Sequence, residues 1–172
     1  MTFATLRTLI EPRRLALRTA RCPFCGWSLL LRVAAHEHGV RCLRCRAGAV
    51  HLSLGSVLRA TFPELVGLRV LELSSRGPLV RWLRRSGARL TLTEFFDDVV
   101  PGAVRDGVRC EDVQRLSFPD ASFDLVTHTE VFEHVEDDAR GMRELHRVLA
   151  PGGATVFSVS LSAAARTSER VR

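Results

Sequence analysis

Four cysteines are spaced so that they could bind one metal ion. Cys22 and Cys25 form one Cys-x2-Cys pair, and Cys42 and Cys45 form a second pair after an interval of sixteen residues. Two residues between cysteines allow one tight turn to aim both thiolates at the same ion, and two such pairs complete the tetrahedron of a structural zinc site. The spacing therefore predicts a zinc ribbon in which all four cysteines bind Zn²⁺.

Two disulfides and a redox Cys-x-x-Cys are the alternative interpretations. Disulfides need an oxidising compartment, but the opening MTFATLRTLI lacks an apolar block followed by a small-residue cleavage site. We therefore expect a cytoplasmic protein with reduced cysteines. His36 and His38 are expected in a turn rather than at the metal, because four cysteines already fill a tetrahedron. The fifth cysteine, Cys110, is predicted to be a buried structural thiol.

A short antiparallel hairpin is expected to position the two cysteine pairs. Residues 29–33 are predicted as one strand, 36–39 as the turn and 40–41 as the return strand. Gly26 supplies the permissive backbone that a tight turn after the first pair needs. Arginines beside the ligands would offset the negative charge of four thiolates: Arg21, Arg41, Arg44 and Arg46.

From about residue 52 onwards, the sequence predicts alternating helices and strands. Predicted strands cover 69–73, 90–94, 108–112, 123–128 and 154–159. Predicted helices cover 53–61, 78 to about 86, and 137–149, with a Pro-Gly-Gly turn at 151–153 ending the last one. Alternation of this kind indicates parallel βαβ units and hence a doubly wound, mostly parallel sheet with its ligand at the carboxyl ends of the strands.

Three segments in this half resemble one family. They are VLELSSRG at 70–77, LSFPDASFDLV at 116–126, and FEHV at 132–135 followed by ELHRVLAPGG at 144–153. Together they resemble the class I S-adenosylmethionine-dependent methyltransferases over about residues 66–160. The resemblance implies a Rossmann-like domain, S-adenosyl-L-methionine as cofactor and methyl transfer as the reaction.

The resemblance also implies roles for acids at the strand ends. Glu94 matches the acid that accepts hydrogen bonds from both ribose hydroxyls, and it lies 22 residues after Glu72, near the ~20-residue offset of nucleotide-binding folds. Solvation of a strand end is its structural alternative. Asp112 matches the acid that reads the adenine amino group. The implied cofactor-binding residues are Glu72, Ser74, Arg76, Gly77, Glu94, Asp112 and Val113.

The loop after the first strand of this half departs from the family pattern. Ser74, Arg76 and Pro78 stand where the family has glycines that let the backbone approach the cofactor, and Gly77 is displaced by one position. Arg76 could pair with the carboxylate of the cofactor. Alternatively, these side chains obstruct the pocket and cofactor binding is weak or lost.

Three residues after the fourth strand are candidate general bases for the methyl acceptor. They are His128, Glu133 and His134. An oxygen or nitrogen acceptor can require a base within hydrogen-bond reach. In the family, however, the Glu-His pair often caps and orients the following helix, so both roles remain open.

Charge and length bound the remaining interpretations. Residues 1–50 hold nine Arg against two Glu, a net charge of +7, whereas 51–172 hold sixteen Arg against seventeen acids. No apolar run is long enough to cross a membrane.

The predicted division is a basic helical arm over 1–20, a zinc ribbon over 21–50 and a methyltransferase domain over 51–172. That domain is expected to be incomplete at its C-terminus, with a partner or a second copy covering an open sheet edge.

Two functions of different classes follow. The first is methyl transfer to a small-molecule, glycan or RNA acceptor. The second is a catalytically inactive binding module in which the ribbon acts and the sheet is scaffold. Sequence alone does not identify the acceptor.

Overall fold

A computed structural model describes residues 15–34 and 39–159. The chain divides into two compact units. The first unit comprises Met1–Val66 and Arg76–Gly87, and the second comprises Gly67–Ser75 and Ala88–Arg172. The predicted division at residues 20 and 50 remains a prediction. Helices in the described ranges all lack the length and apolar character needed to cross a bilayer.

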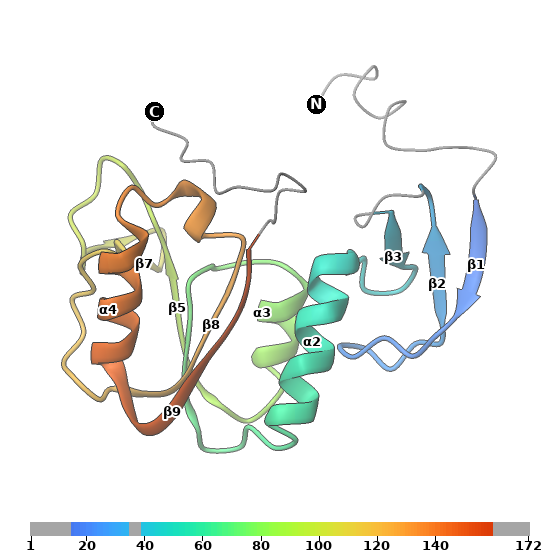
Figure 1. The fold of residues 1–172 in the computed structure, drawn as a ribbon, viewed down its shortest axis with the longest axis horizontal. Helices are drawn as coiled ribbons and strands as arrows, with labels where there is room; N and C mark the ends of the chain where they lie inside the picture. Colours follow the sequence, from blue (N-terminus) through green and yellow to red (C-terminus); the bar gives the residue numbers. More distant parts are fainter. Residues whose placement is uncertain (1–14, 35–38, 160–172) are drawn as a thin grey trace. The chain divides into compact units, whose positions relative to one another are not determined.

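The first unit contains a three-stranded antiparallel sheet. Its strands are β1 (Ala16–Thr19), β2 (Leu29–Arg32) and β3 (Val40–Cys42), in the order β1-β2-β3 (Figure 1). The two predicted strands of the ribbon hairpin are confirmed as β2 and β3. Residues 36–38 of the predicted turn lie outside the described residues.

The predicted helical arm is wrong where the structure describes it. Residues 1–14 lie outside the described part of the chain, but Ala16–Thr19 form strand β1. This strand pairs with β2 from Ala16 opposite Arg32 to Thr19 opposite Leu29. The free edge of β2 offers ladder hydrogen bonds, and tertiary pairing of this kind overrides a weak local helix preference.

Two helices complete the first unit. They are α2 (Ala49–Thr61) and α3 (Pro78–Leu83), which lie side by side (Figure 1). Both predicted helices are confirmed, although α2 begins one turn earlier than expected and α3 is shorter. Their apolar faces are buried: Leu52, Leu54 and Leu58 of α2, and Leu79, Val80 and Leu83 of α3.

The second unit is built on a six-stranded sheet. Its strands are β4 (Arg69–Glu72), β5 (Arg89–Glu94), β6 (Val104–Arg105), β7 (Val108–Cys110), β8 (Phe123–Thr129) and β9 (Leu149–Ser158). The order is β6-β7-β5-β4-β8-β9, and every neighbouring pair is parallel except β6 with β7. The predicted doubly wound, mostly parallel sheet is therefore confirmed.

Strand β6 was not predicted, although the sequence carries its signal. β6 and β7 form a hairpin whose turn is Asp106-Gly107, with φ angles of 49° and 78°. Asp-Gly is a preferred pair for this tight turn because both residues must adopt positive φ. The expected strand over 108–112 is confirmed for its first three residues.

The predicted Pro-Gly-Gly turn is wrong as a break between helix and strand. Residues 151–153 lie inside β9, which begins directly after α4 (Asp138–Val148). The register with β8 shifts between Phe123 and Leu125, and Gly152 has a φ of 81°. The positive φ lets the extra residues form an irregularity within the strand instead of ending it.

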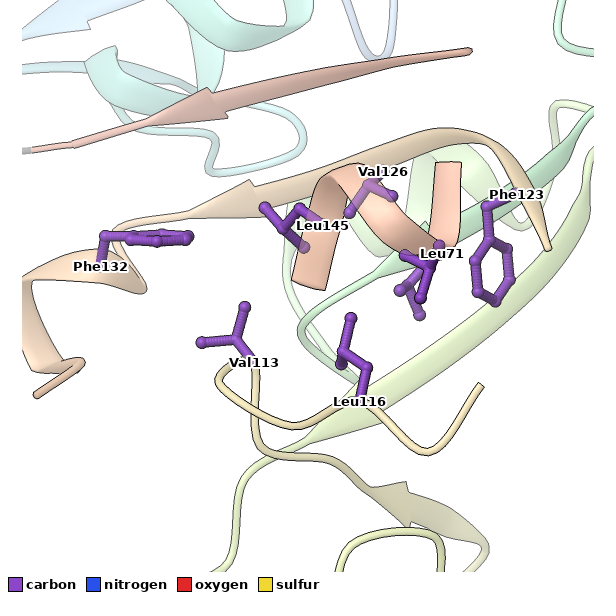
Figure 2. Close-up of a cluster of buried hydrophobic side chains, with 8 residues drawn as sticks. Leu71, Val113, Leu116, Phe123, Val126, Phe132 and Leu145 are labelled. Atoms are coloured by element: carbon purple, nitrogen blue, oxygen red, sulfur yellow. The ribbon is translucent and has the colours of Figure 1, made fainter. Parts of the chain in front are cut away.

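The core of the second unit lies between α4 and the sheet. Figure 2 shows its side chains gathered from β4, β8, α4 and the segment after β7. Helix α4 is held at its start by Asp137, whose carboxylate accepts a hydrogen bond from the Arg140 backbone N–H over 2.8 Å. The eight members of this cluster are Leu71, Val113, Leu116, Phe123, Val126, Phe132, Leu145 and Val148.

Candidate functional site

The strand order places several predicted site residues at one edge of the second unit. The strand order reverses between the neighbouring strands β4 and β8. After β4 the chain adds β5 and then β7 on one side, and after β8 it adds β9 on the other side. Ligands of such sheets bind beyond the carboxyl ends of the strands at this switch point. Glu72 ends β4, and Glu94 ends the neighbouring strand β5.

Glu72 is a buried acid with two hydroxyl partners. Its side chain is fully buried, and its carboxylate accepts hydrogen bonds from Thr127 of β8 and, over 2.7 Å, from Ser74. Burial raises the pKa of Glu72 to about 7, and the two hydroxyls only partly oppose this shift. The carboxyl group is therefore shared between its charged and neutral forms near neutral pH.

Glu94 is held by the loop that follows β4. Its Oε2 atom accepts one hydrogen bond from the Ser75 hydroxyl over 2.6 Å and another from the Ser75 backbone N–H over 3.2 Å. Glu94 is half-buried, so its carboxylate keeps an exposed portion. A carboxylate offers about four lone-pair positions, so Ser75 fixes Glu94 and leaves acceptor capacity for other donors.

The two serines explain how the loop is held without the usual glycines. Ser74 donates to Glu72, and Ser75 donates to Glu94. Each hydroxyl thus binds the acid at the end of one of two adjacent strands. Sequence reasoning assigned Ser74 to the cofactor and did not single out Ser75 or Thr127. The signal for Thr127 was a hydroxyl directly after the buried apolar pair Leu125-Val126, where a buried acid on the neighbouring strand would need a donor.

Asp112 and Val113 differ in exposure. Asp112 is half-exposed and accepts a hydrogen bond from the Gln114 backbone N–H over 2.8 Å, which forms a local turn after β7. Val113 is only 6% exposed and belongs to the apolar cluster under α4. Its predicted role as a cover for the adenine ring remains a prediction.

Arg76 and Gly77 belong to the first unit. Arg76 is exposed. Gly77 has a φ of 112° and precedes α3 as its N-cap, with no side-chain cap. This φ is one that residues with a Cβ rarely adopt, so the displaced glycine is required by the entry into α3.

The three candidate bases occupy different environments. His128 is fully buried between the rings of Phe132 and Phe157, with centroid distances of 5.0 and 4.7 Å. Burial lowers the pKa of His128 to about 4, which keeps its imidazole neutral at pH 7, and neither ring nitrogen has a hydrogen-bond partner among the described residues. Glu133 is half-buried and His134 is exposed, both in the 3-10 turn Phe132–His134.

The four cysteines of the first unit converge on one point. Their sulfur atoms all lie within 4.8 Å of one another. Cys22 lies 3.5 Å from Cys45, and Cys25 lies 3.5 Å from Cys42, measured between sulfur atoms. Four thiolates at such distances form the donor set of a tetrahedral structural zinc site.

The two Cys-x2-Cys turns have matching backbones. We call Cys22–Cys25 the first knuckle and Cys42–Cys45 the second knuckle. Each is closed by a backbone hydrogen bond of 2.9 Å, from Gly26 to Cys22 and from Arg46 to Cys42. Gly26 and Arg46 have positive φ angles of 72° and 63°. The predicted conformational role of Gly26 is confirmed, and the second knuckle places an arginine in the same strained conformation.

Backbone donors in the second knuckle favour a thiolate at Cys42, whereas burial raises the pKa of Cys45 to about 12. Burial opposes ionisation of Cys42, but the N–H groups of Cys45 and Arg44 point at its sulfur, and the pKa of the thiol falls to about 7. Cys110 lies elsewhere, in the second unit, where it is fully buried and donates to the Val99 carbonyl over 3.2 Å. Its prediction as a buried structural thiol is confirmed.

Comparison with known proteins finds similarity over the second half of the chain. Residues 71–157 match a family model described as a methyltransferase domain. Ubiquinone biosynthesis O-methyltransferase of Xanthomonas oryzae pv. oryzae is 32% identical over 105 residues, covering 55% of this chain and 44% of that protein. Demethylmenaquinone methyltransferase of Deinococcus radiodurans is 46% identical over 58 residues, covering 33% of this chain and 24% of that protein. This chain therefore spans less than half the length of these two relatives.

Two solved structures are similar to part of the chain. An S-adenosylmethionine dependent methyltransferase from Mesorhizobium loti is 34% identical, with a TM-score of 0.48 over 61% of this chain and 52% of that chain. The cyclase SpnF is 20% identical, with a TM-score of 0.50 over 77% of this chain and 56% of that chain. The likeness to SpnF shows a shared fold.

Proposed function

The chain belongs to the methyltransferase domain family, and from that premise we propose that it binds S-adenosylmethionine at the carboxyl ends of β4, β5 and β7. The observation that carries the proposal is the pair of acids at adjacent strand ends, each fixed by a serine of the loop after β4. Fixed carboxylates can accept hydrogen bonds from a nucleoside without reorganising when it binds.

Each residue of this edge has a proposed task. Glu94 accepts hydrogen bonds from the ribose hydroxyls, and Asp112 accepts one from the adenine amino group. Glu72 and Ser74 shape the loop between them. Arg76, exposed and next to Ser75, is proposed to pair with the carboxylate of the cofactor. S-adenosylmethionine supplies a methyl group already activated on a sulfonium, so these residues act by binding and orientation.

Calorimetry tests the cofactor site. We expect S-adenosylmethionine and its demethylated product to bind the zinc-loaded chain with a Kd of roughly micromolar order, about 8 kcal/mol of binding free energy. Glu94→Gln should weaken binding at least about 10-fold, because a carboxylate acceptor for two hydroxyls is lost. Glu64→Gln, which changes an exposed acid of the first unit, serves as the matched control. Absence of binding to the folded wild-type chain would favour the inactive binding module, for which the lost glycines argue.

We propose that one of His128, Glu133 and His134 accepts the proton released by the methyl acceptor. His128 is the second-last residue of β8, and Glu133 and His134 follow the strand in the 3-10 turn Phe132–His134. A neutral imidazole can accept a proton, but a pKa of about 4 at His128 makes it a weak base. Separate substitutions, His128→Gln, Glu133→Gln and His134→Gln, should identify the base through a loss of kcat with little change in cofactor Kd. If all three variants keep the kcat of the wild-type chain, the proposal is contradicted.

The acceptor is proposed to be a small molecule, with glycan and RNA as the other outcomes of the test. The relatives named above support this order, because their names refer to ubiquinone biosynthesis and demethylmenaquinone. Mass spectrometry of molecules that co-purify with the chain discriminates the three classes. Recovery of RNA fragments, in place of a low-mass aromatic compound, would overturn the preference.

We propose that Cys22, Cys25, Cys42 and Cys45 hold one structural Zn²⁺. The convergence of their sulfur atoms supports the proposal. Elemental analysis should find one zinc per chain, and Cys42→Ser should remove it. Cys110→Ser, which changes a buried thiol far along the chain, should leave the zinc content unchanged. Zinc retained by Cys42→Ser would contradict this assignment.

A further inference from the structure

Two arginines join the zinc knuckles to the helices of the first unit. Arg59 of α2 donates a hydrogen bond from Nε to the Pro23 carbonyl in the first knuckle. Arg81 of α3 donates from Nη2 to the Cys45 carbonyl in the second knuckle over 2.8 Å. Both carbonyls belong to the turns that carry the cysteines, so a metal bound by the four thiolates would fix them in place. Each helix is therefore tied to a different ligand-bearing turn.

Aromatic packing joins the same parts. The ring of Phe24, in the first knuckle, lies 5.7 Å from the Trp82 ring of α3 between centroids. It also fills the space over Gly55 of α2, where an added Cβ would approach a ring atom to 2.7 Å. The Arg59 guanidinium lies 5.5 Å from the centroid of Trp82. Contacts this close leave α3 little freedom to move while the knuckle stays folded.

Helix α3 depends on such contacts for its position. It has six residues, and its N-cap, Gly77, provides no side-chain hydrogen bond. A helix of this length is unstable alone because nucleation is unfavourable. Its first residue, Pro78, follows Ser75 by three positions, and Ser75 is the residue that holds Glu94.

We propose that the metal-bound knuckles position α3 through Arg81 and Trp82, so that zinc and S-adenosylmethionine bind with positive coupling. The inference rests on the proposed cofactor site, because the connection runs along the chain from α3 to the loop at Ser75. Coupling of this kind is reciprocal: each ligand raises the affinity of the other by the same factor. Arg81 and Trp82 are thus positioning residues.

The coupling is measured by titrating S-adenosylmethionine into zinc-loaded and zinc-stripped full-length chain. We expect the Kd to rise about 5- to 100-fold when zinc is removed. Equal affinity in the two forms would overturn the coupling and leave the cofactor site standing. Absent binding even to the zinc-loaded chain would instead overturn the proposed function. Hydrogen exchange of residues 78–83 without cofactor adds a readout that is independent of that function, and zinc removal should accelerate it.

Arg81→Ala tests the connection without removing the metal. The variant should keep its zinc, bind S-adenosylmethionine as weakly as the stripped wild-type chain, and lose the dependence of Kd on zinc. Arg81→Lys, which retains a donor, should restore part of that dependence. Arg84→Ala, an exposed arginine at the end of the same helix, is the matched control and should behave as wild type. If stripping unfolds the whole chain, the zinc-loaded Arg81→Ala and Arg84→Ala variants decide: equal Kd values overturn the proposal.

Discussion

The first and second units place different chemistry in their interiors. In the first unit, short strands surround four cysteines, and two helices contact the knuckles through aromatic rings and arginines. In the second unit, a six-stranded sheet packs an apolar cluster against α4, and its buried polar groups include the acid Glu72. Small folds with limited cores commonly depend on a metal. The comparison predicts that loss of the proposed zinc destabilises the first unit, and that core truncation and pH act on the second.

A spectroscopic difference makes the two units separately observable. The chain has two tryptophans and no tyrosine, and both tryptophans, Trp27 and Trp82, lie in the first unit. Tryptophan fluorescence therefore reports the first unit alone, whereas far-UV circular dichroism reports both.

Removal of zinc should have the largest effect. Structural zinc contributes about 10–16 kcal/mol in small zinc-dependent folds, so chelation should abolish the cooperative fluorescence transition of the first unit. Circular dichroism should retain a transition from the second unit. Re-addition of zinc is the control and should restore fluorescence. A fluorescence transition that survives complete chelation would break the proposed difference between the units.

Core truncation should select the second unit. Leu145 of α4 is 2% exposed within the apolar cluster, so Leu145→Ala should lower the free energy of unfolding by about 2–5 kcal/mol. The loss should appear in circular dichroism, with the fluorescence midpoint unchanged. Met142→Ala, on the same helix and 39% exposed, is the control and should change stability far less. Equal losses from both variants would contradict the assigned core.

The buried acid predicts a pH dependence of stability. Burial raises the pKa of Glu72 from 4.5 to about 7 in the folded state, so between these values the folded chain binds a proton that the unfolded chain has released. Stability contributed by this group is therefore fully present below pH 4.5 and falls as pH rises through 7. Glu72→Gln should remove the dependence and stabilise the chain at pH 8, by up to about 3 kcal/mol, but not at pH 4.

Urea titrations at the two pH values, compared between wild type and Glu72→Gln, measure this effect. Taking the difference in unfolding free energy between the two chains removes the contribution of all other acids, because these titrate in both chains. Glu136→Gln, which alters an exposed acid, should show no such difference. A gain from Glu72→Gln that is equal at both pH values would refute the raised pKa.

The smallest expected effect compares the two knuckles. Arg46 has the positive φ that Gly26 has in the first knuckle, and a residue with a Cβ is less stable in that conformation by about 1–2 kcal/mol. Arg46→Gly should stabilise the first unit by at most about 1 kcal/mol, since glycine also raises the entropy of the unfolded chain. Gly26→Ala should destabilise it by a similar amount. Fluorescence-detected unfolding of the zinc-loaded protein measures the stability of both variants. An increase in stability from Gly26→Ala would contradict the assigned role of positive φ at this position.

The sequence was most informative where the pattern was local. Strand patterns located β4, β5, β7 and β8, and the Cys-x2-Cys spacing located four cysteines whose sulfur atoms converge, because each strand and each cysteine pair is a local signal. The strand β1 was missed because its four residues are all exposed and carry no alternation. Its existence depends on pairing with β2, whose partner residues lie 10 to 16 positions further along the chain.

The site could be predicted only in part for the same reason. Glu72 and Glu94 are strand-end residues, which a pattern can find. The partners Ser75 and Thr127 could not be assigned, because the bond from Ser75 to Glu94 spans 19 positions and the bond from Thr127 to Glu72 spans 55. Such pairings follow from the strand order, which places β4 between β5 and β8.

The first unit is discontinuous along the chain, because α3 arrives only after β4 has been made. On the ribosome, the knuckles would emerge well before the helix that Arg81 ties to them. An expression fragment ending at residue 66 would lack Leu79, Val80 and Leu83, and a fragment starting at 67 would carry those apolar side chains without their neighbours on α2. Separation of the two units therefore requires the two segments of each unit to be joined by a linker or co-expressed, since a single cut leaves both units incomplete.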